Sequence, residues 1–288
     1  MKSKLFNQLG GIIAVIILIV AVYLWLTPYF KGLLEINPVV FKIGELTVYW
    51  YGLLLAIGVL SGLMWLNWRV SDDKLKSHII NIAALSIASG IIGARLAFVI
   101  LKWSEFSGNW IEMISLQHGG MSIHGALILG ALTVLIYAKV YKLPILRIFD
   151  LLVPPVLIGQ IIGRFGNFFN QEAFGPPTDL PWKMFVKSSL RPAGFSEFEF
   201  FHPTFIYSMI GLIIILSIVL LWRKLRSIEG YTLFIYIALY SVLRFVIEFF
   251  RIDSDYWINL TLAQWASLII ILSLIISLVL RYRVKAKQ

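Results

Sequence analysis

The sequence contains no cysteine and few charged residues. None of its 288 residues is Cys, and 14% are Asp, Glu, Lys or Arg, whereas an average soluble domain has about 25%. Without a thiol of its own, the chain cannot form a disulfide, a thiolate zinc site or a cysteine nucleophile. The four histidines are widely separated and lack the spacing of metal ligands. We therefore expect no metal site, and no cofactor is assigned to the protein.

Apolar residues are abundant instead. They make up 59% of the chain, and apolar runs of about 18 or more residues recur, each long enough to cross a bilayer core as a helix. The alternating segments of about ten residues that form transmembrane β-barrels do not dominate. The predicted fold class is an all-α integral membrane protein, a polytopic helical bundle.

The apolar pattern predicts seven core membrane spans and one extra N-terminal helix. The core spans are expected near residues 48–68, 79–101, a stretch ending near 141, 147–170, 202–222, 231–250 and 260–280. We predict that residues 1–28 form an N-terminal anchor helix, which is retained because no small-residue cleavage site follows it. Residues 29–288 are expected to form the main domain, with a polar loop near 171–201 outside the membrane.

The basic residues indicate how the spans are oriented. The net charge is +10, but 15 of the 25 Lys and Arg lie at the N-terminus, at 69–78, 139–147 and 223–226, and after residue 280. This placement in short loops is a topology signal and argues against nucleic acid as a partner. Eight spans put all five segments on one side, which the positive-inside rule makes cytoplasmic. The outer side then holds these polar residues: Tyr51, His124, Arg164, His202 and Arg244.

One group of polar residues ends the predicted span 147–170. Within nine positions come a cation, two carboxamides and a carboxylate, namely Arg164, Asn167, Asn170 and Glu172. In a helix the first three share a face, because each is three residues from the next. Hydrocarbon does not tolerate such groups without partners. Two interpretations stay open: a helix end whose side chains reach the interface, or a site for an anionic, hydrogen-bonding ligand.

A second polar group lies along the predicted span 231–250. Its members are spaced by four, four and three residues, which predicts one stripe of a helix: Tyr240, Arg244, Glu248 and Arg251. In one interpretation Arg244 and Glu248 simply neutralise each other. In the other, Arg95 and Arg164 lie at the same depth, and the arginines need an anion to offset their charge. Guanidinium groups bind phosphate oxygens bidentately, so the natural anion is a phospholipid headgroup.

A histidine and a tyrosine add possible acid–base groups. His124 lies among Gly119, Gly120 and Gly125, where the backbone can approach a ligand closely. Histidine suits proton transfer near neutral pH, although a single histidine at a helix start is also compatible with a structural role. Tyr51 is either part of an aromatic belt at the membrane interface or a positioning group.

These segments resemble the prolipoprotein diacylglyceryl transferase family over nearly the whole chain from about residue 37. Residues 163–175 are similar to its motif G-R-x-x-N-F-x-N-x-E-x-x-G, and residues 50–52, 120–125, 244 and 248–251 match its tyrosine, histidine and late arginine segments. Two features depart from the family pattern. Phe205 and Ser208 replace a glutamine and a glutamate that are usual after the His-Pro pair, and the N-terminal helix is additional.

The resemblance implies a function and a set of site residues. Family members in the bacterial cytoplasmic (inner) membrane transfer the diacylglyceryl group of phosphatidylglycerol to the lipobox cysteine thiol of a preprolipoprotein, forming a thioether and releasing glycerol phosphate. The reaction would take place toward the outer leaflet, in residues 29–288. The expected catalytic residues are His124 as base, Arg164, Arg244 and Tyr51. The expected substrate-binding residues are Asn167, Asn170, Glu172, Gly175, Tyr240, Glu248, Arg95 and Arg251.

Two other classes of function were weighed against this transferase. A lipid or anion transporter is expected to carry ionisable residues near the bilayer midplane and to show repeated halves, but this sequence shows no repeat. A non-catalytic membrane anchor or assembly subunit would leave the arginines without a role. Product analysis separates the classes, because only the enzyme makes a new bond between lipid and cysteine.

Overall fold

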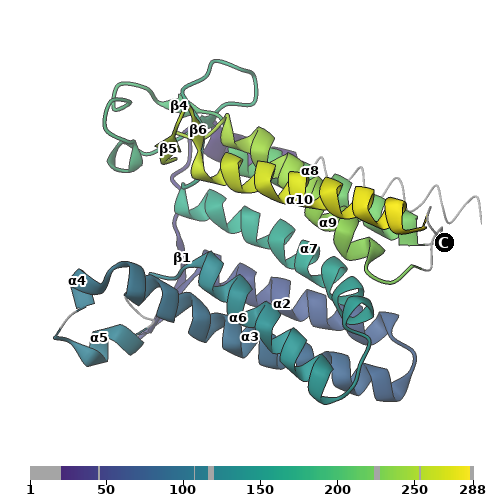
Figure 1. Cartoon of the computed structure of the whole chain (residues 1–288). Helices are drawn as coiled ribbons and strands as arrows, with labels where there is room; N and C mark the ends of the chain where they lie inside the picture. The colour runs from purple at the N-terminus through teal and green to yellow at the C-terminus, as the bar shows by residue number, and fades with distance from the viewer. Residues whose placement is uncertain are drawn as a thin grey trace, which may run out of the picture. The chain divides into compact units, whose positions relative to one another are not determined.

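The structure is a computed structural model, and it describes residues 21–44, 46–106, 108–115, 120–223, 228–252 and 254–285. Within these ranges seven helices are long and apolar enough to cross a membrane (Figure 1). They are α2 (Trp50–Arg69), α3 (Asp73–Leu101), α6 (Ile123–Val140), α7 (Ile145–Asn170), α8 (Thr204–Arg223), α9 (Tyr231–Glu248) and α10 (Leu262–Lys285). The predicted fold class, a multi-pass α-helical membrane protein, is confirmed.

The predicted N-terminal anchor is described only in part. Residues 21–30 are helical, and the rest of the predicted helix within 1–28 lies outside the described residues. The retention of this helix, and the division of the chain at residue 28, stay predictions.

Several short elements between the spans were not predicted. They are the strands β1 (Val39–Ile43) and β2 (Leu46–Tyr49), the helices α4 (Trp103–Phe106) and α5 (Trp110–Ile114), the strands β3 (Met184–Phe185) and β4 (Phe200–Phe201) with the 3-10 turn η1 (Ser188–Leu190), and the strands β5 (Tyr256–Trp257) and β6 (Leu260–Thr261). Each pair of strands is antiparallel. Most of these elements are too short to show a periodic pattern in the sequence. The loop 171–201 thus has the structure of a small hairpin.

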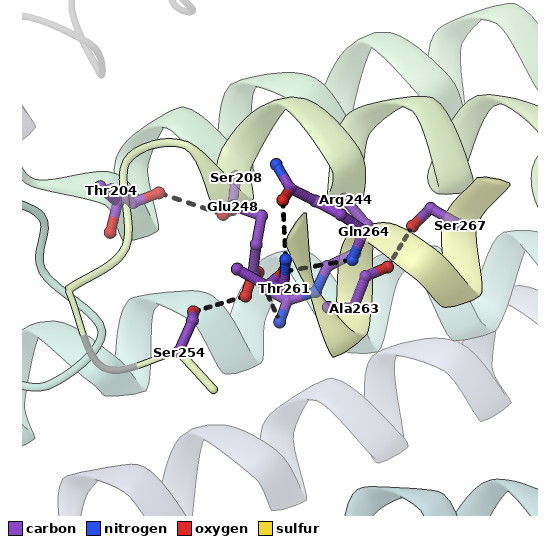
Figure 2. Close-up of polar contacts among 9 residues, drawn as sticks. All are labelled: Thr204, Ser208, Arg244, Glu248, Ser254, Thr261, Ala263, Gln264 and Ser267. Carbon is purple, nitrogen blue, oxygen red and sulfur yellow. Dashed lines mark hydrogen bonds and ion pairs between the residues drawn. The ribbon is translucent and has the colours of Figure 1, made fainter. Parts of the chain in front are cut away.

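Helix caps explain where two spans begin. The span predicted from residue 79 begins at Asp73, because the Asp72 carboxylate accepts a hydrogen bond from the Leu75 amide (2.8 Å). The span predicted from residue 260 begins at Leu262 instead. Thr261 and Gln264 form a reciprocal capping box there: each side chain accepts from the other's backbone amide, at 3.2 and 3.0 Å. Figure 2 shows this box.

The described chain divides into two compact units. The first unit consists of the chain up to Leu55, Ile161–Leu212 and the chain from Tyr240 onward. Its core is rich in aromatic rings: Phe168, Phe201 and Phe205 are almost completely buried, and Phe169 stacks on Trp50 with ring centroids 4.7 Å apart. This core supports the end of α7, where the first polar group of the sequence lies.

The second unit consists of Ala56–Gln160 and Ile213–Leu239. In it, α3 and α6 pack side by side (Figure 1), and Gly93 and Gly125 permit their closest approach. A Cβ on Gly93 would lie 2.4 Å from the Gly125 carbonyl oxygen. The carboxylate of Asp150 on α7 accepts hydrogen bonds from the backbone amides of Gly230 (2.7 Å) and Leu233 (2.8 Å). It thereby caps the start of α9.

Candidate active site

The end of α7 carries the predicted polar face. The helix runs to Asn170, so Arg164, Asn167 and Asn170 have the predicted helical spacing. Asn167 is only 7% exposed, yet no residue in the described chain hydrogen-bonds its side-chain amide. The same holds for the guanidinium of Arg164, which also has no ion pair there. Arg164 is half-buried, so both side chains keep hydrogen-bonding groups that a polar ligand could use.

The chain turns sharply after Asn170. The Glu172 amide donates to the Asn167 carbonyl (3.0 Å), and Asn170 Nδ2 donates to Glu172 Oε1 (3.3 Å). Gln171 adopts a φ of +48°, and its Nε2 donates to the Phe185 carbonyl (3.2 Å) while its Oε1 accepts from the Lys187 amide (3.0 Å). Gln171 thus ties the motif to β3. It was not predicted as a site residue, because its two partners lie 14 and 16 residues away.

Gly175 lies where three segments of the first unit meet. Its amide donates to the His202 carbonyl (2.8 Å). A Cβ here would lie 2.5 Å from the Phe250 carbonyl oxygen and 2.8 Å from the Thr204 Cγ2 atom. This geometry favours a packing role for Gly175, which was predicted to bind substrate.

On α9 the predicted ion pair is present. Arg244 Nη2 lies 2.8 Å from Glu248 Oε2 (Figure 2), in an ion pair that lacks the alignment of a hydrogen bond. Glu248 is 3% exposed, and its Oε1 accepts from the Ser254 hydroxyl. The carboxylate of Glu248 is therefore held by Arg244 on the same helix and by Ser254 in the chain after the helix.

The predicted stripe of four residues extends beyond the last residue of α9. Helix α9 ends at Glu248, and the next three amides bond to carbonyls only three residues back, including Arg251 to Glu248 (3.2 Å). In such 3-10 geometry side chains three residues apart lie one above the other, so these bonds do not remove Arg251 from the side of Glu248. Arg251 still lies within electrostatic reach of Arg244.

Arg164 and Arg244 share one cleft in the first unit. Its lining is Arg164, Ser208, Leu212, Tyr240, Leu243, Arg244 and Ile247, and its free volume is about 10 Å³, enough for about one water. Ser208 donates its hydroxyl to the Thr204 carbonyl (3.0 Å), so it brings no charge to the cleft. Arg244 interacts electrostatically with Arg164 and Arg251 as well as with Glu248. The cleft and its border therefore combine three guanidinium groups with one buried carboxylate.

Tyr51 packs beside this region of α7. A Cβ on Gly166 would lie 2.6 Å from the Tyr51 ring atom Cδ2, so the glycine admits the ring against the helix. The Tyr51 phenol interacts electrostatically with Glu172 and Arg164. Tyr51 thus belongs to the same unit as the two arginines predicted to be catalytic, Arg164 and Arg244.

The other two predicted site residues lie in the second unit. His124 is in the first turn of α6 and its side chain is exposed. Arg95 on α3 is 6% exposed, and it donates hydrogen bonds to the backbone carbonyls of Met113 (2.9 Å), Gly120 (3.0 Å) and Glu112. These bonds favour a structural role for Arg95, which was predicted to bind substrate.

A set of three hydrogen-bonded rings at the start of α8 was not predicted: Trp182, His202 and Tyr207. His202 Nδ1 lies 2.9 Å from the Tyr207 hydroxyl, which accepts a hydrogen bond from Trp182 Nε1 (2.7 Å). Partial burial lowers the pKa of His202 below its ordinary value. No spacing rule signals this group, because Trp182 is 25 residues from Tyr207. His118 lies outside the described residues, and those described include no cluster of three or more possible metal ligands.

Comparison with known proteins identifies the family. A family model described as prolipoprotein diacylglyceryl transferase matches residues 38–280. A relative from Parasynechococcus marenigrum is 41% identical over 75% of this chain and 81% of its own length. Relatives from Trichormus variabilis (39%; 81% and 85%) and Synechococcus elongatus (38%; 86% and 89%) match similarly. All three are named phosphatidylglycerol–prolipoprotein diacylglyceryl transferase. This chain therefore belongs to the prolipoprotein diacylglyceryl transferase family.

Proposed function

We propose that this protein transfers the diacylglyceryl group of phosphatidylglycerol to the lipobox cysteine thiol of a preprolipoprotein. The names of its relatives supply the two substrates. The observation that carries the proposal is the cleft of the first unit, which both Arg164 and Arg244 line. An excess of positive charge at the end of membrane helices suits a lipid phosphate.

The reaction breaks a carbon–oxygen bond at a phosphate ester. The sulfur of the substrate thiolate attacks the diacylglyceryl carbon that bears the ester oxygen, so a carbon–sulfur bond forms. The electron pair of the broken bond goes to the phosphate oxygen, and glycerol phosphate leaves. Arg164 and Arg244 stabilise the charge that grows on this oxygen, and Glu248 orients Arg244.

The attacking thiol must first lose its proton, because the thiolate is the nucleophile. His124 is the proposed base, and the proton passes from the thiol sulfur to its imidazole. Tyr51 and Tyr240 position the reacting groups. No step in this scheme requires a redox change or a cofactor.

Substrate binding must widen the cleft. Its free volume of about 10 Å³ holds a water but not a phosphate group. The lining side chains of Arg164, Tyr240 and Arg244 can change rotamer, because long side chains have many of them. The unsatisfied amide of Asn167, with Asn170 and Glu172, is proposed to bind the hydroxyl groups of the glycerol headgroup.

The distribution of basic residues supports a location and an orientation. We propose that the protein lies in the bacterial cytoplasmic membrane with its active site toward the outer leaflet. The Lys- and Arg-rich segments at 69–78 and 139–147 would then lie in the cytoplasm.

Product analysis tests the proposed function. The purified protein in lipid nanodiscs would receive phosphatidylglycerol, isotope-labelled in the glyceryl carbons of its diacylglyceryl group, and a synthetic lipobox peptide. We expect labelled diacylglyceryl peptide and an equal amount of glycerol phosphate by mass spectrometry. The adduct should resist hydroxylamine, because a thioether does and a thioester does not. A matched peptide with serine for cysteine should stay unmodified. Lipid movement across the bilayer without any adduct would instead establish a transporter.

A further inference from the structure

A buried arginine in the second unit makes bonds that the proposed reaction does not use. Arg95 is 6% exposed, and its Cζ atom lies 5.8 Å from the ring centroid of Phe98 and 5.1 Å from that of Phe106. Its Nε and Nη1 atoms donate to the carbonyls of Met113 (2.9 Å) and Gly120 (3.0 Å). Burying a guanidinium in a membrane protein is costly, so these bonds need a structural or functional reason.

The carbonyl partners of Arg95 lie within the connection between α3 and α6, which comprises residues 102–122. Met113 and Glu112, whose carbonyl also accepts from Arg95, belong to the short helix α5. Gly120 lies three residues before α6 begins. One side chain on α3 therefore bonds both to α5, in the middle of this connection, and to the chain just before α6.

A second set of contacts fixes the chain just before α6. The Ser122 amide donates to the carbonyl of Ala94 (2.9 Å), and Ala94 is the residue immediately before Arg95. Gly120 has a φ of +76° and lies against the Phe98 ring, where a Cβ would come within 2.3 Å of a ring carbon. Side-chain and backbone bonds from adjacent residues of α3 thus define the path of residues 120–122.

The next polar side chain after this fixed segment is that of His124. It is exposed in the first turn of α6, and no described residue hydrogen-bonds its imidazole. Most histidines that act as bases are oriented by a bond to the second ring nitrogen. Here the backbone fixes the position of the residue, because the next residue, Gly125, packs against Gly93 of α3.

We propose that Arg95 is a positioning residue: through the backbone of residues 120–122, it sets the place of His124 for proton transfer. This assignment depends on the proposed function, in which His124 is the base. In this role the Arg95 guanidinium binds backbone carbonyls of the protein and not a lipid phosphate. Lysine cannot replace it, because an ammonium group lacks the planar fork that reaches three separated carbonyls.

The test compares Arg95→Gln and Arg95→Lys with the wild type in the nanodisc assay. Both variants should lower kcat about 10- to 100-fold at pH 7, as expected when a general base is misplaced. KM for phosphatidylglycerol should change less than about 3-fold. The loss should shrink as pH rises past the ordinary thiol pKa of about 8.5, because the substrate thiol then ionises without a base.

A double-variant cycle gives an independent readout. Arg95→Gln combined with His124→Asn should be no slower than His124→Asn alone, since residues that act through one group are not additive. Hydrogen exchange of the amides in residues 120–125 should rise in Arg95→Gln. Ser89→Ala on the same helix is the matched control, because it removes a 2.7 Å bond to Thr133 of α6 without touching this connection.

Several results would overturn the positioning role. One is a raised KM with partial rescue by Arg95→Lys, which indicates a phosphate contact. Another is a loss that is constant with pH and multiplies with that of His124→Asn. A third is a loss that vanishes after correction for the folded fraction, as measured by fluorescence size-exclusion chromatography. If the wild type forms no thioether at all, the proposed function fails, and the exchange of residues 120–125 still reports whether Arg95 fixes them.

Discussion

Arg244 and Glu248 are joined by a 2.8 Å ion pair between side chains one turn apart on α9. The two partners differ in burial, because the Glu248 side chain is 3% exposed and that of Arg244 is 26% exposed. The carboxylate is therefore the fixed partner and the guanidinium the accessible one. Since Arg244 also lines the cleft with Arg164, we propose that Glu248 orients the Arg244 guanidinium toward the proposed phosphate position.

Replacing Glu248 with glutamine tests this aiming role. The change keeps the shape but removes the charge that holds Arg244, and breaking a buried pair costs about 3 kcal/mol. We expect kcat to fall about 10-fold or more and the melting temperature to drop, measured by product formation and by thermal unfolding. Ser254→Ala is the matched control, because it removes the other bond to Glu248 and leaves the ion pair. An equal loss in both variants would contradict a specific role for the charge.

Arg164 should contribute to the transition state rather than to folding. No described residue forms a hydrogen bond or ion pair with its guanidinium, so truncation leaves no unpaired partner behind. Arg164→Ala should lower kcat about 100- to 1,000-fold, as loss of a donor to a developing anion does, with little change in thermal stability. Lys183→Ala, which removes a cation paired with Asp179 in the loop between α7 and α8, should keep full activity. Normal activity of Arg164→Ala would remove this residue from the site.

The parts of the fold that follow helical periodicity could be predicted from the sequence. The seven core spans and the polar face of Arg164, Asn167 and Asn170 depend on apolar length and on spacings of three. The Arg244–Glu248 pair follows from a spacing of four, although spacing left open whether the two side chains pair. The end of this span was predicted two residues too late, at Phe250, because the apolar run continues through Phe249 and Phe250 while the helix ends at Glu248.

Contacts between distant segments could not be predicted. Gln171 bonds to the β3 region, and Arg95 bonds to carbonyls 17 to 25 residues away. Backbone carbonyls are present at every residue, so the sequence gives no sign of which ones a side chain will reach. The two-residue strands likewise depend on tertiary pairing rather than on an alternating pattern.

His124→Asn tests the base directly. Asparagine keeps a similar size and polarity but cannot accept the proton, so kcat at pH 7 should fall about 100-fold or more. The deficit should become smaller above pH 9, where most of the substrate thiol is ionised. Rates measured between pH 6 and 10 provide the check. A loss of only a few-fold at pH 7 would demote His124 to a positioning group.

Gly175→Ala should interfere with folding rather than with chemistry. The new methyl group would meet the Phe250 carbonyl oxygen at 2.5 Å, and backbone cannot move aside cheaply, so we expect a loss of about 1–3 kcal/mol in stability. Gly159→Ala on α7 is the matched control, because nothing lies within 4 Å of its Cβ position, and alanine favours a helix over glycine. Thermal unfolding of both variants gives the comparison. A stable but inactive Gly175→Ala would instead support a direct substrate role.

The burial of His202 predicts an acid-sensitive region before α8. Burial lowers the pKa of His202 in the folded protein, below the ordinary value of about 6.5 that applies when the chain is unfolded. The unfolded state therefore binds the proton more readily, and stability falls as pH drops below about 6.5 and through the folded pKa. Above pH 6.5 the imidazole of His202 is neutral in both the folded and the unfolded state, so the stability is not reduced by its protonation.

His202→Gln should flatten this acid dependence, since glutamine does not titrate. The melting temperature of the wild type should fall more between pH 7 and pH 5 than that of the variant, as measured by tryptophan fluorescence. Tyr207→Phe supplies the comparison: it removes the 2.9 Å contact to Nδ1 but keeps the ring beside Phe250. Because partial burial alone lowers the pKa, Tyr207→Phe should keep the acid dependence while losing stability at every pH. An unchanged acid response in His202→Gln would show that other groups control it.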